Sequence, residues 1–154
     1  MKKIINPYDK TPGYFCFGCS HNNPFGLHMD FYEDGEEVVS VWDPQERFQG
    51  YHNILHGGIQ ATLMDEAASW LVYSRMKISG VTSKLDIKYK RPVPTDKGAI
   101  KVRAKLREMK RNLAFIHVQL TDAEGNLCAE ADAVFYTYTR EYSIKHLGLP
   151  EDSE

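Results

Sequence analysis

The stretch that decides the fold runs from residue 56 to residue 76 and reads HGGIQATLMDEAASWLVYSRM. Between Ile59 and Ser74 it has no proline, no glycine and little β-branching, which predicts a helix. Its apolar residues lie nearly all the way round the helix, so we expect burial on most sides. Asp65 and Glu66 are the only charged residues before Arg75. A carboxylate in a buried helix must be paired, hydrogen-bonded or functional, so we expect chemistry here.

A chain of 154 residues suits one domain with a real core. We therefore predict a single domain over residues 1–154, with an irregular N-terminal arm over 1–14 and a loosely held polar C-terminal tail over 141–154. The formal net charge of −2 gives no field that would favour nucleic acid. No apolar run approaches the roughly 18 residues of a membrane span, and the first residues do not form a signal peptide. Three cysteines fit a cytoplasmic protein without a disulfide framework.

The segments on either side of the helix are rich in β-formers. Two strands are predicted before it, at residues 27–32 and 37–42, with a hairpin turn between them. The helix is expected to end over residues 77–80, with Gly80 as its terminator. Four further strands are predicted at residues 84–90, 100–106, 113–121 and 127–135. Strands joined by short connections are normally antiparallel neighbours, so the sequence predicts an α+β fold in which a sheet wraps around one helix.

Several motifs resemble those of the hotdog-fold acyl-CoA thioesterases, and the PaaI-like branch of the phenylacetate pathway is the most similar group. The motifs are His56-Gly57-Gly58 at a helix start, Asp65 nine positions after the histidine, and Thr82 followed by LDIKYKRP over residues 85–92. Phe48-Gln49-Gly50-Tyr51 and the CFGC and NPFGL segments within residues 16–27 also recur in this superfamily. The resemblance covers roughly residues 15–138. It implies a hotdog fold, hydrolysis of an acyl-CoA substrate without a cofactor, and self-association as a homodimer or a dimer of dimers.

The chemistry of these residues suits thioester hydrolysis. Two glycines at a helix start let a substrate approach the backbone and leave free N–H groups at the positive end of the helix dipole. Gly57 N–H is therefore the candidate donor to a carbonyl oxygen that gains negative charge. Asp65 is the candidate general base or nucleophile, with a pKa that burial should raise. Glu66, about 100° further round the helix, is the substitute for Asp65.

The spacing between the two groups adds a constraint. Nine residues of helix advance about 13 Å and turn about 900°, so His56 and Asp65 should lie on opposite faces. Either one of them is structural, or the site combines His56 and Gly57 of one subunit with Asp65 of another, as in a two-fold dimer. The resemblance implies the shared site, with Asp65 and Thr82 reaching into the partner's half and the Thr82 hydroxyl helping to hold a water molecule. Ser83, one position later, is the alternative hydroxyl.

Candidate substrate contacts surround these residues. Asn53 and Gly58 flank the turn at the helix start, and the phosphates of coenzyme A need cations and donors. Such groups occur in two clusters, Lys90-Arg91 at a strand end and Arg111-Asn112 in the next loop.

Each candidate also has a purely structural interpretation. Gly57-Gly58 could be only a tight turn, His56 only a capping or loop residue, and Asp65 a buried partner of Arg75 or of a lysine. Most strand lysines and arginines belong to solvated faces.

Two questions stay open from the sequence. Cys16 and Cys19 supply only half of a zinc site, and Cys128 lies far away in a strand, so we expect no metal and assign the pair to packing. The activity is expected to be hydrolysis. The alternatives are a hotdog dehydratase acting on hydroxyacyl thioesters and a non-catalytic protein that binds acyl thioesters. The order of histidine, glycines and acid on one helix fits the thioesterase pattern better than the dehydratase pattern.

Overall fold

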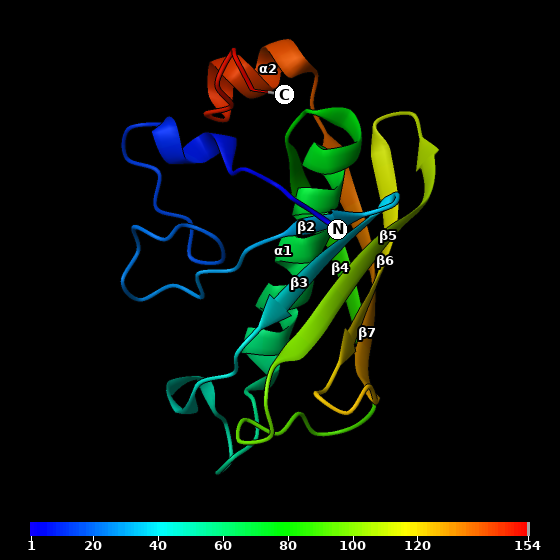
Figure 1. Ribbon diagram of the computed structural model, residues 1–154. Helices are drawn as coiled ribbons and strands as arrows, with labels where there is room; N and C mark the ends of the chain where they lie inside the picture. The colour runs from blue at the N-terminus through cyan, green and yellow to red at the C-terminus, as the bar shows by residue number, and fades with distance from the viewer. Residues whose placement is uncertain (154) are drawn as a thin grey trace.

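A computed structural model describes residues 1–153, in which one seven-stranded antiparallel sheet wraps around the helix α1 (Gly57–Met76) (Figure 1). This confirms the predicted α+β fold. The other elements are β1 (Lys2–Lys3), the 3-10 helix η1 (Pro7–Lys10), β2 (Tyr32–Asp34), β3 (Glu37–Trp42), the 3-10 helix η2 (Glu46–Phe48), β4 (Gly80–Tyr89), β5 (Ile100–Lys110), β6 (Leu113–Thr121), β7 (Leu127–Thr137) and α2 (Arg140–His146).

The strand order is β1-β2-β3-β5-β6-β7-β4, so the sheet closes around α1 in a way that the sequence only partly predicted. β4 and β5 follow each other in the chain but are not neighbours, because residues 90–99 form a proline-containing loop instead of a tight turn. β5 pairs with β3, with Val38 opposite Ala104. β4 pairs with β7 alone, which leaves it as a ten-residue edge strand. The expectation that consecutive strands are neighbours is therefore wrong for β4 and β5.

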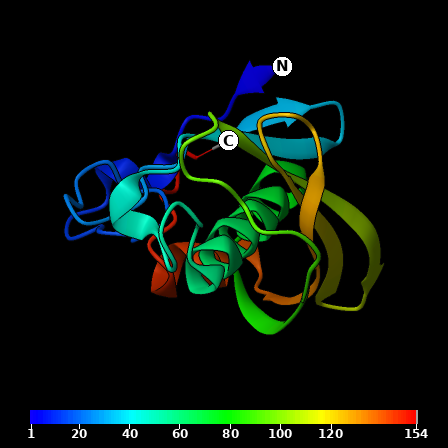
Figure 2. The same ribbon diagram turned by 90° about the horizontal axis from the view of Figure 1, so that it is seen from below.

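α1 lies between the sheet and the N-terminal segment, which explains its apolar residues on all sides (Figure 2). On the side away from the sheet, the chain from residue 27 to residue 31 supplies buried side chains, among them Phe31, whose ring stacks on Trp70 at 5.5 Å. The buried residues of α1 itself are Gln60, Leu63, Met64, Ala67, Ala68, Trp70, Leu71, Val72 and Tyr73. The predicted burial of the helix is confirmed.

The start of the first predicted strand and the residue that terminates the helix differ from the prediction. Residues 27–31 do not belong to a strand, because His28 adopts a positive φ of 53° that interrupts the extended backbone, and β2 begins only at Tyr32. The helix ends at Lys77, whose left-handed φ of 55° places its N–H on the carbonyl of Tyr73 at 2.8 Å. Gly80, the predicted terminator, instead begins β4.

The C-terminal segment is more ordered than a loose tail. Arg140–His146 forms α2, which Thr139 caps by accepting the Tyr142 N–H at 3.1 Å. Arg140 donates to the carbonyl of Lys77 at 2.8 Å and Leu149 is buried, so this segment is fastened to the end of α1. The prediction of a loosely held tail is wrong for these residues, and its last residue, Glu154, lies outside the described residues.

In the N-terminal arm, the structure adds β1 and η1 to a segment that was predicted to be irregular. Over residues 1–153, neither helix has the length and apolarity that crossing a membrane requires.

Candidate functional site

Asp65 and Thr82 meet where the middle of α1 passes the start of β4. Thr82 Oγ1 donates a hydrogen bond of 2.6 Å to Asp65 Oδ1. Burial raises the pKa of Asp65 above its ordinary value, and the hydrogen bond from Thr82 opposes this by a smaller amount. Arg75, the structural partner considered for Asp65, instead lies 3.7 Å from Glu36. Within residues 1–153 the second oxygen of Asp65 has no hydrogen-bond partner, so it is available to a water molecule.

A β-bulge decides which hydroxyl faces the acid. Thr82 lies opposite Phe135 and Lys84 lies opposite Val134, so Ser83 between them has no partner residue on β7. Such an extra residue re-aims the side chains on both sides of it. Both residues are exposed, but it is Thr82 whose hydroxyl is hydrogen-bonded to Asp65. The structure therefore distinguishes the two hydroxyls that the sequence left open.

The turn at His56-Gly57-Gly58 provides one free backbone donor. His56 is the N-cap of α1, and its Nδ1 accepts the Gly58 N–H at 2.9 Å. The N–H of Gly58 is thereby occupied. In the described part of the chain the Gly57 N–H has no partner, and it lies at the positive end of the α1 dipole.

Tyr89 is a contact that the sequence analysis missed. Its hydroxyl donates to the carbonyl oxygen of Gly57 at 2.7 Å and so ties the start of α1 to the end of β4. The alternation of the strand placed Tyr89 on an apolar face, and no local signal marked its hydroxyl. Gly57 and Asp65 are eight residues apart, about 12 Å along the helix axis, and they contact opposite ends of β4. One chain thus presents two separated half-sites.

The predicted phosphate contacts are also divided between the two ends of β4. Lys90 and Arg91 follow the end of β4, near Gly57, and Lys90 Nζ lies 3.4 Å from Glu130. Arg111 and Asn112 form the turn between β5 and β6, which lies at the other end of β4.

Asn112 and Asn53, two of the predicted substrate contacts, are held by hydrogen bonds to their backbone carbonyls. Thr137, opposite Gly80 at the start of β4, donates to the carbonyl of Asn112 at 2.8 Å. Asn53 adopts a positive φ of 60°, and its carbonyl accepts the Thr95 N–H at 3.0 Å.

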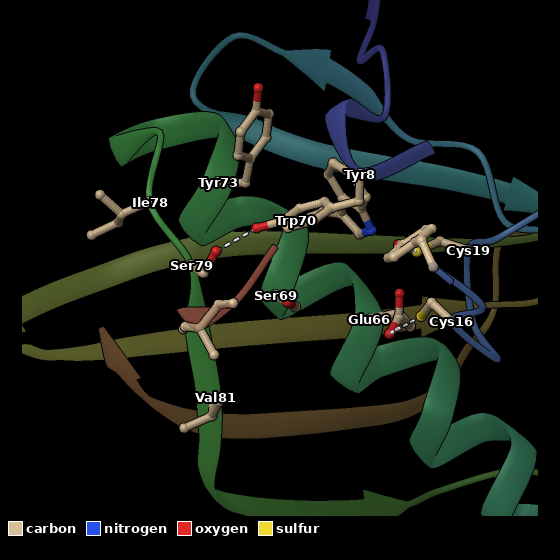
Figure 3. A pocket seen from close by; sticks show the side chains of 13 residues that line it. Tyr8, Cys16, Cys19, Glu66, Ser69, Trp70, Tyr73, Ile78, Ser79 and Val81 are labelled. Atoms are coloured by element: carbon tan, nitrogen blue, oxygen red, sulfur yellow. Dashed lines mark hydrogen bonds between the residues drawn. The ribbon is translucent and has the colours of Figure 1, made fainter. Parts of the chain in front are cut away.

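Glu66 does not join Asp65 and Thr82. Its Oε1 lies 3.5 Å from Cys16 Sγ, and Cys19 lies beside them (Figure 3). Burial raises the pKa of Glu66 to about 8. Hydrogen bonding from the Cys19 thiol, assisted by the backbone N–H groups of Cys19 and Gly18, lowers the pKa of Cys16 to about 5. The three side chains line a cavity of about 220 Å³ whose wall also includes Trp70.

Comparisons with known proteins identify a family for this chain. The family model described as "Thioesterase superfamily" matches residues 52–129. A curated protein of Saccharolobus solfataricus named "Putative esterase SSO1253" is 29% identical over 126 residues, which cover 81% of this chain and 82% of that protein.

Two solved structures share the fold. The PaaI protein from the phenylacetic acid degradation operon of E. coli has a TM-score of 0.67 at 18% identity, covering 74% of this chain and 82% of that one. The Streptococcus mutans protein smu.793, solved with bound acetyl CoA, has a TM-score of 0.65 at 18% identity, covering 73% of this chain and 90% of that one.

Proposed function

This chain belongs to the thioesterase superfamily, and from that premise we propose that it hydrolyses an acyl- or aroyl-CoA thioester to a carboxylic acid and free coenzyme A. The observation that carries the proposal is the contact between Thr82 and Asp65, which orients a half-buried acid and leaves one of its oxygens free. A raised pKa makes that acid a stronger base than an exposed aspartate.

The reaction follows from the two half-sites. Gly57 N–H donates to the thioester carbonyl oxygen and stabilises the negative charge that develops there. Asp65 takes a proton from a water molecule whose oxygen attacks the carbonyl carbon. The carbon–sulfur bond then breaks, and the coenzyme A thiolate takes up a proton as the acid leaves. In the nucleophilic alternative the Asp65 carboxylate attacks the carbonyl carbon, expels the coenzyme A thiolate and forms a mixed anhydride. If water then opens this anhydride at the aspartyl carbon, a single turnover in ¹⁸O water releases unlabelled acid, whereas general-base hydrolysis releases labelled acid.

The site is completed by a second copy of the chain. β4 is an edge strand of ten residues, largely exposed, and an exposed edge of this length is a template for pairing. An antiparallel two-fold pair of β4 strands brings the start of one strand to the end of the other. Gly57 of one subunit would then face Asp65 and Thr82 of its partner. The same pairing brings the Arg111 turn of one subunit toward Lys90 of the other.

The narrower assignment to the PaaI-like branch rests on the motif over residues 56–65 and the strand motif over residues 82–92. It favours aromatic acyl groups among the substrates. We also propose that the protein is cytoplasmic, consists of a single domain, and associates as a dimer or a dimer of dimers.

The test is release of free thiol from short, long and aromatic acyl-CoAs by the wild type and by Asp65→Asn, which keeps the shape of the side chain. Asp9→Asn, an exposed acid in η1, is the matched control. Hydrolysis by the wild type and the control, with the Asp65→Asn protein folded but inactive, supports the proposal. Tight acyl-CoA binding without turnover by the wild type would favour a binding protein, and hydration of enoyl thioesters would favour a dehydratase.

A further inference from the structure

A cluster of two thiols and a carboxylic acid joins the N-terminal segment to α1. Cys16 and Cys19 come from the loop after η1, and Glu66 comes from α1. One ligand atom from each lies within 4.8 Å of the others. All three side chains border the same cavity, in which Cys16 and Glu66 face each other (Figure 3). The proposed hydrolysis gives none of them a role.

The loop that carries the cysteines has a fixed backbone. The Ser20 N–H donates to the carbonyl of Cys16 at 3.1 Å, and the Met29 N–H donates to the carbonyl of Gly18 at 3.0 Å. These bonds close the turn and attach it to the extended chain that covers α1. The backbone that carries the two cysteines is therefore held in place before any ligand binds.

Donors around the sulfur atoms suit thiolates. The Tyr14 hydroxyl lies 2.9 Å from Cys19 Sγ. Hydrogen bonds of this kind orient metal ligands and stabilise their charged form.

Glu66 approaches this loop through a space that only glycine leaves open. A Cβ atom built on Gly18 would lie 2.2 Å from Glu66 Cγ and 2.4 Å from its Cδ. A side chain at residue 18 would thus displace the carboxylate from the two sulfur atoms. The glycine in the CFGC sequence permits the three ligand atoms to come together.

The cluster lacks a positive charge. Among residues 1–153, no lysine, arginine or histidine forms an ion pair with Glu66. Buried carboxylates are normally paired with a cation or bound to a metal, because an isolated charge in the interior is costly. A divalent cation would balance the charges of deprotonated ligands here.

We propose that Cys16, Cys19 and Glu66 bind a Zn²⁺ ion, with the fourth coordination position open to the cavity. Tetrahedral zinc, with Zn–S of about 2.3 Å and Zn–O of about 2.0–2.2 Å, places its ligands about 3.5–3.8 Å apart. The distance from Cys16 Sγ to Glu66 Oε1 is already 3.5 Å. Two sulfur ligands favour zinc over magnesium or calcium. The ion would fasten the N-terminal segment to the helix that carries Asp65.

The direct test is titration of the reduced, metal-free full-length protein with Co²⁺ and then Zn²⁺. We expect one Co²⁺ per chain with a thiolate-to-cobalt charge-transfer band, which Zn²⁺ abolishes. X-ray absorption of the zinc-loaded wild type should show two sulfur and two lighter ligands. Zinc at about 100 times its Kd should raise Tm by about 5–10 °C.

Variants assign the ligands. Cys16→Ser and Cys19→Ser should lose the charge-transfer band, and Glu66→Gln should bind Co²⁺ at least about 10-fold more weakly. Cys128→Ser, a buried thiol in β7, is the matched control and should behave as the wild type. The proposal fails if the wild type gives no such band, if the band survives in both cysteine variants, or if absorption shows only oxygen and nitrogen ligands. A Cys16–Cys19 disulfide that persists under reductant would also overturn it.

Discussion

The proposed division of the site between two subunits predicts that two inactive variants restore activity when mixed. Gly57→Pro removes only the N–H that is proposed to bind the carbonyl oxygen. Proline suits the first position of a helix, and the preceding His56 already has the extended backbone that a residue before proline prefers. An added Cβ at residue 57 would lie 3.7 Å from the Tyr89 ring, an ordinary contact. Gly57→Pro should lower kcat about 10²- to 10³-fold, whereas Gly57→Ala, which keeps the N–H, is the control.

The size of the recovery follows from two-fold symmetry. When Gly57→Pro and Asp65→Asn chains exchange at equal amounts, half of the dimers contain one chain of each kind, and each such dimer has one intact site of two. The mixture should therefore show about a quarter of wild-type activity. Thiol release is measured on the unfractionated mixture after co-expression, and a mixture of Asp65→Asn with Asp65→Ala is the control. No activity above the sum of the separate variants would refute the shared site.

Three further changes test individual contacts. Thr82→Val should lower kcat/KM about 10- to 100-fold, because it removes a hydrogen bond to a charged group that is worth about 1.5–3 kcal/mol. Ser83→Ala should leave kcat/KM unchanged, and an equal loss in both variants would contradict the role of the bulge. His56→Ala should lower the free energy of unfolding by about 0.5–2 kcal/mol in urea, while His56→Asn keeps a cap and should lose less; equal losses would argue against capping. Gly18→Ala should lower the free energy of unfolding of the metal-free protein by about 1–3 kcal/mol in urea, and adding Glu66→Ala should restore part of this loss. Gly50→Ala is the control, because an added Cβ there would lie 3.6 Å from its nearest atom.

The elements that the sequence predicted best are those with long-range repetition. The apolar residues on all sides of α1 predicted a buried helix, and the alternation of apolar and polar residues in β6 predicted a strand. The structure gives β6 its predicted bounds, Leu113–Thr121. The start of the first strand and the identity of the residue that terminates the helix were missed, because nothing in the composition shows that His28 or Lys77 adopts a positive φ. The strand order was missed where a ten-residue loop replaced a turn.

For the candidate site, spacing along one helix was enough to separate Gly57 from Asp65. Contacts between distant segments were not accessible in this way. The hydroxyl of Tyr89 reaches Gly57 only because β4 passes the start of α1. Glu66 reaches Cys16 only because the N-terminal segment covers the helix. The sequence showed half of a metal site, since the third ligand lies far along the chain.

The two edge strands of the sheet, β1 and β4, differ in length and composition. β1, at the edge opposite β4, is two residues long and consists of Lys2 and Lys3, which are both exposed. Short strands and lysines are the features that prevent a sheet edge from recruiting another strand. A dimer joined through β4 therefore has lysines at both outer ends of its continuous sheet. In the proposed dimer, growth of the sheet by strand addition would stop at two chains, so pairing through β4 would not lead to fibres.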